Sequence, residues 1–212
     1  MTTAAAPPAI TLAELAALVR QRRPGTGRLL VGIAGPPGAG KSTVARQLAG
    51  RLGECAAVVG QDGFHLAHAV LERSGQVGRK GAPETFDAHG FVAALERVRN
   101  ERGHHVWLPG FDRSIEDSIA QAIDVAPHHD VVIVEGNYLL LDQPPWGSIR
   151  DLLGLAVYVE IDDETRVRRL VDRHVSHGRS PADAAAFVGD SDERNARLVA
   201  AGRSRADVVL RR

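Results

Sequence analysis

Eight consecutive residues have the types and the spacing needed to hold a chain of phosphates. They match the pattern G-x-x-x-x-G-K-[ST], known as the P-loop, and read Gly35-Pro36-Pro37-Gly38-Ala39-Gly40-Lys41-Ser42. Glycines let the backbone curl so that successive N–H groups face an anion, and a following helix adds its positive N-terminal end. We therefore predict that residues 35–43, Thr43 included, bind ATP, with Lys41 acting catalytically on the terminal phosphates and Ser42 giving an oxygen ligand to Mg²⁺.

Two carboxylates follow apolar runs that are typical of buried strands. Glu135 comes directly after the apolar residues 131–134, and Asp62 closely follows the run at 56–59. Parallel strands place their carboxyl ends on the edge of the sheet where the P-loop also lies. We therefore expect Glu135 to orient Mg²⁺ and Asp62 to be the catalytic base for an acceptor hydroxyl. Each acid also has a simpler interpretation, because Glu135 can cap the strand exit and Asp62-Gly63 can form a turn.

Strands and helices alternate along the chain in a way that positions these residues. Short apolar runs typical of buried parallel strands occur at 28–34, 55–59, 131–134, 155–161 and 206–210. Helical spacing of apolar residues follows a capping box at 11–14 and recurs at 41–52, 87–100, 164–177 and 181–188. A brief strand at 106–108 is expected to end at Pro109-Gly110. This alternation predicts an α/β fold: a doubly wound parallel sheet with helices on both faces.

The changes in residue composition along the chain predict one P-loop domain over residues 1–212 with three distinct parts. Residues 1–24 are expected to form an N-terminal tail and helix. Residues 62–113 are polar and rich in glycine and histidine, so we interpret them as an inserted substrate lobe that covers the site. Residues 162–190 hold an arginine-rich helix and a turn, and we interpret them as a lid region.

Basic residues on the predicted lid helix fall at steps of three and four and therefore share one face, formed by Arg166, Arg169, Arg173 and His177. Arginines over a phosphate site neutralise the charge that spreads over the transferred phosphoryl group. We favour Arg169 and Arg173 as catalytic residues, with Arg169 also contacting ATP. The alternative is a solvated surface helix with local ion pairs.

Several polar residues beside the two acids are candidates for substrate binding: His65, Lys80, Arg113, Asn137 and Tyr138. Lys80 shares its loop with Glu84 and Asp87, and such a cluster either binds polar substrate groups or holds the insert together. Two roles remain open for Asn195: it contacts a ligand, or it caps a helix.

Composition excludes several other classes of protein. The 212 residues carry 26 basic and 26 acidic side chains, so the net charge is zero. The chain therefore lacks the excess of basic residues that is typical of nucleic-acid-binding proteins. The single cysteine excludes an internal disulfide framework, and no apolar stretch approaches the ~20 residues that span a membrane. Residues 1–8 lack the charged start and apolar block of a signal peptide, so we expect a cytoplasmic protein. Only two of the basic residues are lysines, Lys41 and Lys80, and both lie in candidate active-site loops.

The motifs together resemble the phosphoribulokinase/uridine kinase family, which also includes type I pantothenate kinase and plant-type glycerate kinase. The resemblance covers about residues 29–210 and rests on the P-loop and on residues 62–65, 135–140 and 206–207. It is closest to a bacterial branch described as nucleoside/nucleotide kinase-like or as fructose-transport kinase, through residues 79–87, 109–113 and 173–174.

This resemblance implies a core sheet of order 2-3-1-4-5, ATP·Mg²⁺ as the donor, and transfer to an alcohol of a small metabolite. It also implies that the position of Asp62 serves as the catalytic base. Uridine kinases commonly carry Arg-Asp in the lid helix where this chain has Arg173-His174, which argues against uridine as the acceptor.

We therefore expect an ATP-dependent kinase that phosphorylates a hydroxyl of a small metabolite: a sugar, a nucleoside, or a pantothenate-like or glycerate-like acceptor. A GTPase is disfavoured because no N-K-x-D element is present. The competing hypothesis is a nucleotide-dependent switch protein that phosphorylates no metabolite. The apolar residues of the first helix are expected to pack on the core or on a second copy in a homodimer.

Overall fold

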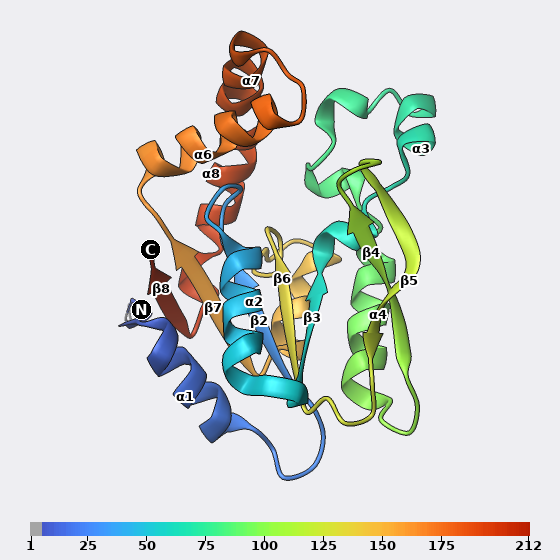
Figure 1. Ribbon diagram of the computed structural model, residues 1–212, viewed down its shortest axis with the longest axis vertical. Coiled ribbons are helices and arrows are strands. Elements are labelled where there is room, and N and C mark those ends of the chain that lie inside the picture. Colours follow the sequence, from blue (N-terminus) through green and yellow to red (C-terminus); the bar gives the residue numbers. More distant parts are fainter. Residues whose placement is uncertain (1–5) are drawn as a thin grey trace.

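A six-stranded parallel sheet forms the centre of the molecule in the computed structural model, which describes residues 6–212 (Figure 1). Its strands lie side by side in the order β1 (Ala9–Ile10), β8 (Val208–Arg211), β7 (Leu155–Glu160), β2 (Leu29–Ala34), β6 (Val131–Gly136) and β3 (Ala56–Gly60). Counted along the chain from β2, the five predicted strands have the order 2-3-1-4-5, so that prediction is confirmed. The two-residue strand β1, which is too short to give a sequence pattern, adds an edge beyond β8.

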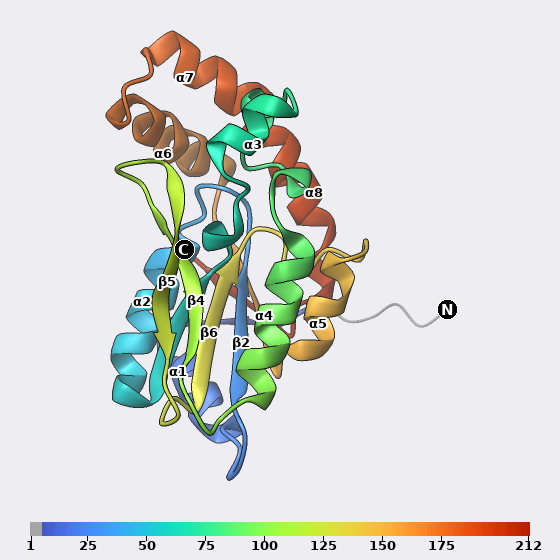
Figure 2. The same ribbon diagram turned by 90° about the vertical axis from the view of Figure 1, so that its right-hand side faces the viewer.

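Helices cover both faces of the sheet, as the binary pattern predicts (Figures 1 and 2). One face packs against α1 (Leu12–Arg22) and α2 (Lys41–Leu52), and the other against α4 (Ala88–Asn100), α5 (Ile149–Leu152) and α8 (Glu193–Ala201). Neighbouring residues of one strand serve opposite faces, because side chains alternate along a strand. In β2, for example, Leu30 lies in the core under α4, while Val31 lies in the core under α1 and α2.

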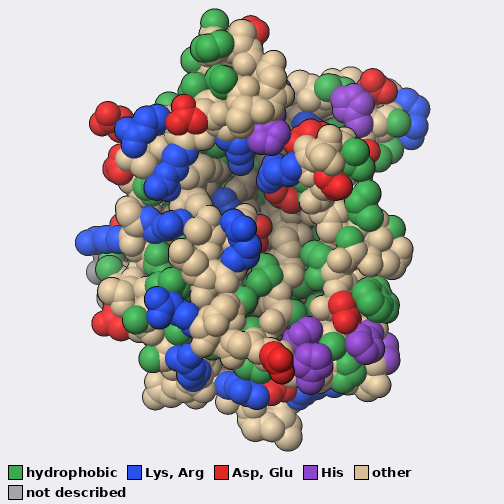
Figure 3. Space-filling view, viewed as in Figure 1, with side chains coloured by type: hydrophobic (Ala, Val, Ile, Leu, Met, Phe, Trp, Pro, Cys, Tyr) green, Lys and Arg blue, Asp and Glu red, His purple; other side chains and the backbone are tan. Residues whose placement is uncertain are grey.

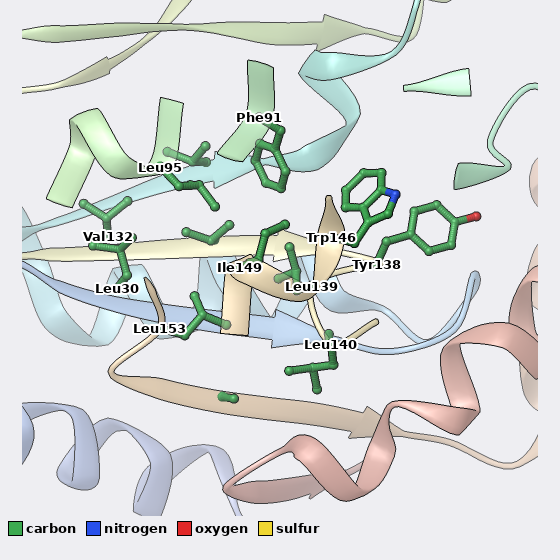
Figure 4. Close-up of a cluster of buried hydrophobic side chains, with 14 of the residues drawn as sticks. Leu30, Phe91, Leu95, Val132, Tyr138, Leu139, Leu140, Trp146, Ile149 and Leu153 are labelled. Carbon is green, nitrogen blue, oxygen red and sulfur yellow. The ribbon is translucent and has the colours of Figure 1, made fainter. Parts of the chain in front are cut away.

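The core on the α4 side continues beyond the sheet into a cluster of aromatic rings (Figure 4). Phe91 of α4 contacts Trp146, and Trp146 contacts both Tyr138 and Phe86. Tyr138 follows β6, so this cluster fixes the chain directly after the strand that carries Glu135.

A separate antiparallel hairpin, β4 (Val106–Asp112) and β5 (Asp117–Val125), packs beside β3. The prediction that the first of these strands ends at Pro109-Gly110 is wrong, because the strand continues through a register shift between Leu108 and Gly110. Proline has no N–H to donate, and a bulge lets the ladder continue past it. The hairpin meets the chain after β3 so closely that a Cβ on Gly63 would lie 2.3 Å from the carbonyl oxygen of Pro109.

Two groups of elements rise above the carboxyl ends of the central strands (Figures 1 and 2). On one side are α6 (Asp163–Ser176) and α7 (Pro181–Phe187), which leads through a wide turn (Val188–Asp192) into α8. On the other side are α3 (His68–Arg73) and the tip of the β4–β5 hairpin. The side chain of Asp162 caps α6 and that of Ser180 caps α7, each by accepting a bond from a backbone N–H in the first turn.

None of the helices within residues 6–212 has the length and apolar character that crossing a membrane requires.

Candidate active site

The P-loop wraps around the N-terminus of α2, which begins at Lys41. Gly38 and Gly40 have φ angles of +80° and +85°, a region that residues with a Cβ rarely adopt. Gly38 also lies directly under α6, because a Cβ there would be 2.8 Å from Cγ of Leu170. The glycines of the motif are therefore required both by the turn of the loop and by the packing of the lid helix upon it.

Lys41 is buried, with 8% of its surface exposed, and its Nζ donates to the carbonyl oxygen of Pro36 at 3.1 Å. Burial lowers the pKa of Lys41 to about 8, although the nearby charges of Glu135 and Asp62 act in the opposite direction. A buried ammonium group with little compensation is suited to bind an anion, since a phosphate chain would supply the missing negative charge.

The two residues predicted to hold Mg²⁺ contact each other. Ser42 Oγ donates to Glu135 Oε1 at 2.9 Å, which joins the start of α2 to the end of β6. Burial raises the pKa of Glu135, and the negative charge of Asp62 raises it further. A hydroxyl and a carboxylate are the hard oxygen ligands that Mg²⁺ prefers, and Mg²⁺ usually takes only one or two protein ligands beside phosphates and waters. The donor set therefore fits this ion.

Asp62 lies in the short turn Gln61–Phe64 that follows β3, next to the end of β6. The buried side chain of Gln61 joins these two strand ends, since its Oε1 accepts a bond from the backbone N–H of Tyr138 at 3.0 Å. Asp62 Oδ2 accepts a bond from Nη2 of Arg113 at 2.8 Å, and the Asp62 carbonyl accepts one from Nδ1 of His65 at 2.8 Å. The turn thus brings the second predicted acid, and two predicted substrate-binding residues, to the edge where Lys41 and Glu135 lie.

These residues line one cavity of about 400 Å³ that opens between the α6–α7 side and the α3–hairpin side (Figure 3). The predicted residues on its wall are Pro37, Gly38, Lys41, Ser42, Asp62, His65, Lys80, Arg113, Glu135, Asn137 and Arg173. The cavity therefore brings together residues from four separate parts of the sequence: the P-loop, the 62–113 segment, the end of β6 and α6.

Tyr138 does not reach the cavity. It is fully buried, and its hydroxyl donates to the carbonyl oxygen of Gly81 at 2.5 Å. The prediction of a substrate contact fails here because the ring is needed in the aromatic cluster with Phe86 and Trp146. Tyr138 instead holds the loop that carries Lys80.

The arginines of α6 have different environments. Arg173 is half-buried on the cavity wall, where burial and the charge of Arg113 lower its pKa. Arg169 is exposed outside the cavity, and its Nη1 lies 3.9 Å from the position of a Cβ on Gly40. Arg166 is buried and pairs with Asp163 and with Glu193 of α8, so it anchors the lid helix to its neighbour.

The expected Lys80–Glu84–Asp87 cluster does not form. Glu84 pairs with Arg79 at 2.5 Å, and Asp87 caps α4 by accepting a bond from the N–H of Gly90. The Nζ of Lys80 instead donates to the carbonyl of Glu116 at the hairpin tip.

The cavity is also lined by residues that the sequence did not point to. On the lid side, His174 Nε2 lies 2.9 Å from Asp192 Oδ2, and the His174 ring meets Phe187 edge-on. On the hairpin side, Phe111 belongs to the wall. Asn195, which the sequence left open, also lines the cavity, and its Nδ2 lies 3.4 Å from the Gly81 carbonyl oxygen. For the group formed by His174, Asp192 and Phe187, the sequence offers one signal: the pair Arg173-His174, where uridine kinases commonly carry Arg-Asp.

Comparison with known proteins agrees with this geometry. A family model described as "AAA domain" matches residues 31–194. The chain is 31% identical over 194 residues to a candidate uridine kinase of Schizosaccharomyces pombe, covering 86% of this chain and 83% of the relative. It is 34% identical over 150 residues to the uridine kinase of Clostridium perfringens, covering 70% and 69%. A solved structure of a candidate fructose transport system kinase from Silicibacter sp. TM1040 has a TM-score of 0.87 at 39% identity, covering 94% of this chain and 98% of that one.

The fold and the site define a P-loop kinase. The chain belongs to the AAA domain family matched over residues 31–194, and it is related to the uridine kinases. It is a phosphotransferase that acts on a hydroxyl of a small metabolite.

Proposed function

We propose that this kinase transfers the γ-phosphoryl group of ATP·Mg²⁺ to an acceptor whose hydroxyl is activated by Asp62. The observation that carries the proposal is the position of the two acids. Asp62 follows β3, Glu135 lies at the end of the adjacent parallel strand β6, and both line the same cavity as Lys41 and Ser42. Glu135 contacts a P-loop hydroxyl, while Asp62 pairs with Arg113 on the acceptor side of the cavity.

On the nucleotide side, the P-loop backbone and Lys41 hold the phosphates, while Ser42 and Glu135 hold the metal ion. When bound, Mg²⁺ supplies positive charge that offsets the β- and γ-phosphate oxygens. Arg173 faces the same space from the lid helix and stabilises the charge on the transferred group. Arg169 lies outside the cavity, beside Gly40, and in this proposal it contacts the nucleotide from there.

On the acceptor side, Asp62 orients the hydroxyl and takes its proton. The acceptor oxygen forms a bond to the γ-phosphorus as the bond from that phosphorus to the bridging oxygen breaks, and ADP leaves. The proton on Asp62 then passes to water. In this scheme residues 62–113 supply the acceptor-binding surface, and residues 162–190 close over the phosphates.

The test is ADP release from ATP·Mg²⁺ with a panel of sugars, nucleosides, pantothenate and glycerate. We expect turnover that depends on one acceptor class, and we expect Asp62→Asn to lower kcat by roughly 10²-fold or more while ATP affinity is unchanged. Asp142→Asn, at an exposed loop position away from the cavity, is the matched control. Turnover that ignores every added metabolite favours a nucleotide-dependent switch instead, and an unchanged kcat removes Asp62 from the role of base.

A further inference from the structure

The acceptor side of the cavity holds a lysine without an acidic partner. Within residues 6–212, Lys80 forms no ion pair with a carboxylate, and the bond of its Nζ goes to a backbone carbonyl, that of Glu116. The carboxylates of its own loop are engaged elsewhere, Glu84 with Arg79 and Asp87 at the cap of α4. A cation that lines a cavity without a counter-charge is suited to a ligand that brings one.

A second cation, Arg113, lies against the same aromatic ring as Lys80. The Nζ of Lys80 is 5.3 Å from the centroid of Phe111, and the guanidinium carbon of Arg113 is 5.5 Å from it. The ring of His65 also packs on Phe111, with 5.0 Å between centroids. Burial lowers the pKa of His65 and so favours its neutral form, which leaves Lys80 and Arg113 as the cations beside Phe111.

The counter-ion of Arg113 is the proposed base itself. Arg113 Nη2 lies 2.8 Å from Asp62 Oδ2, and the two side chains are 48% and 37% exposed. Ion pairs this open to water are weak, so the guanidinium can exchange partners readily. While the pair is formed, Asp62 Oδ2 is engaged by Arg113. An acceptor anion that binds Arg113 would leave this oxygen free for the acceptor hydroxyl.

The other carboxylates on the wall do not supply the missing charge. Glu135 contacts Ser42, and Asp192 pairs with His174 on the lid side. Glu116 is exposed at the hairpin tip, where its backbone carbonyl rather than its carboxylate meets Lys80.

We infer that the acceptor carries an anionic group, a carboxylate or a phosphate, which Lys80 and Arg113 bind beside Phe111. This inference rests on the proposed function, because it assigns the substrate class of the same cavity. A neutral acceptor would leave both cations without a ligand partner as the cavity loses water, whereas an anion satisfies both and releases Asp62.

The test compares acceptors that share a skeleton and differ in charge: glycerol with D-glycerate and glycerol 3-phosphate, fructose with fructose 6-phosphate, and panthenol with pantothenate. We expect kcat/KM for ADP release to favour the anionic member of the productive set. Lys80→Gln and Arg113→Gln should each raise KM for that member by roughly 10- to 100-fold, the usual size of a lost charged hydrogen bond. KM for the neutral member should change much less, because that acceptor offers no charge to either side chain.

Arg79→Gln is the matched control, because Arg79 neighbours Lys80 in sequence but pairs with Glu84 outside the cavity wall. The carboxylate and phosphate members show which anion the site prefers. The inference is overturned if the neutral member is turned over as well as its anionic partner and if KM is the same in the wild-type protein, Lys80→Gln and Arg113→Gln.

Calorimetric binding separates this inference from the proposed function. The same acceptors are titrated into full-length protein saturated with Mg²⁺ and a non-hydrolysable ATP analogue, so that the P-loop is already filled. If anionic members bind more tightly and this preference is lost in Lys80→Gln, the anion site is supported, whether or not any acceptor yields ADP. A failure of every acceptor to yield ADP would refute the kinase proposal instead. Equal binding of charged and neutral members refutes the anion site.

Discussion

The nucleotide side and the acceptor side of the cavity are built in different ways. On the nucleotide side, Lys41, Ser42 and Glu135 lie at the ends of α2 and β6, elements whose core residues are buried. On the acceptor side, Lys80 and Arg113 come from a loop and a hairpin tip, where Lys80 is half-buried and Arg113 is exposed. Under the proposed function, the residues that hold the phosphates and the metal ion are anchored to the core, while acceptor selection depends on one half-buried and one exposed side chain whose loss should cost little stability.

The largest effect should follow from removing the central charge of the nucleotide side. Lys41→Met should lower kcat/KM for ATP by roughly 10²- to 10³-fold, because a positioned charge at the phosphates is lost. Affinity for a nonreactive acceptor analogue should change little if the two sides are independent. Steady-state kinetics and calorimetry measure both, and an equal loss on both sides would break the comparison.

The buried ammonium group of Lys41 also predicts a pH dependence for the nucleotide side. In the free protein its pKa is about 8, and bound phosphates stabilise the charged form and raise this pKa. Affinity should therefore be constant below pH 8 and should fall as pH rises above it, by up to about tenfold per unit. Dissociation constants for ATP between pH 6.5 and 9.5 measure this. A constant affinity across that range would mean that Lys41 does not titrate there.

A smaller effect, confined to the acceptor side, should follow from moving the hairpin. In Gly63→Ala the new Cβ would meet the Pro109 carbonyl, so the hairpin must shift, at a cost of about 1–3 kcal/mol in the free energy of unfolding. Acceptor KM should rise while ATP affinity is kept. Gly50→Ala in α2, where a Cβ would meet nothing within 4 Å, is the control and should not destabilise the protein. Chemical denaturation and acceptor kinetics compare the two variants, and loss of ATP binding in Gly63→Ala would contradict the separation.

The nucleotide side could be predicted from sequence because each of its signals is local. The P-loop is one continuous motif between a strand and a helix, and both predicted elements are present as β2 and α2. Buried parallel strands are near-continuous apolar runs, and two such runs place Glu135 and Asp62 at strand ends without knowledge of the rest of the chain. Their roles stay predictions until the variants are measured.

The acceptor side could not be predicted to the same extent because no continuous motif or apolar run marks its residues. Strand β5 alternates weakly, since most of its residues are exposed or half-buried, and no sequence pattern marks it. Tyr138 has a polar hydroxyl beside a catalytic strand, yet packing with Phe86 and Trp146 decides where it lies. The partner of Lys80 depends on how the hairpin folds over the loop, and only the three-dimensional structure gives that information.

The short strand β1 has a consequence for how the protein behaves at high concentration. An open edge of a sheet exposes unpaired N–H and C=O groups to which another chain can add, which is a common route to aggregation. Ala9 and Ile10 occupy this edge of β8 in parallel register, and the carbonyl of Pro8 accepts a bond from the N–H of Val209. Pro7 and Pro8 have no N–H to donate, so the ladder does not extend through them. Strand β1 has only two paired residues and follows two prolines, so the edge of the sheet that it forms is very short. Another chain therefore has few groups to which it could add a further strand.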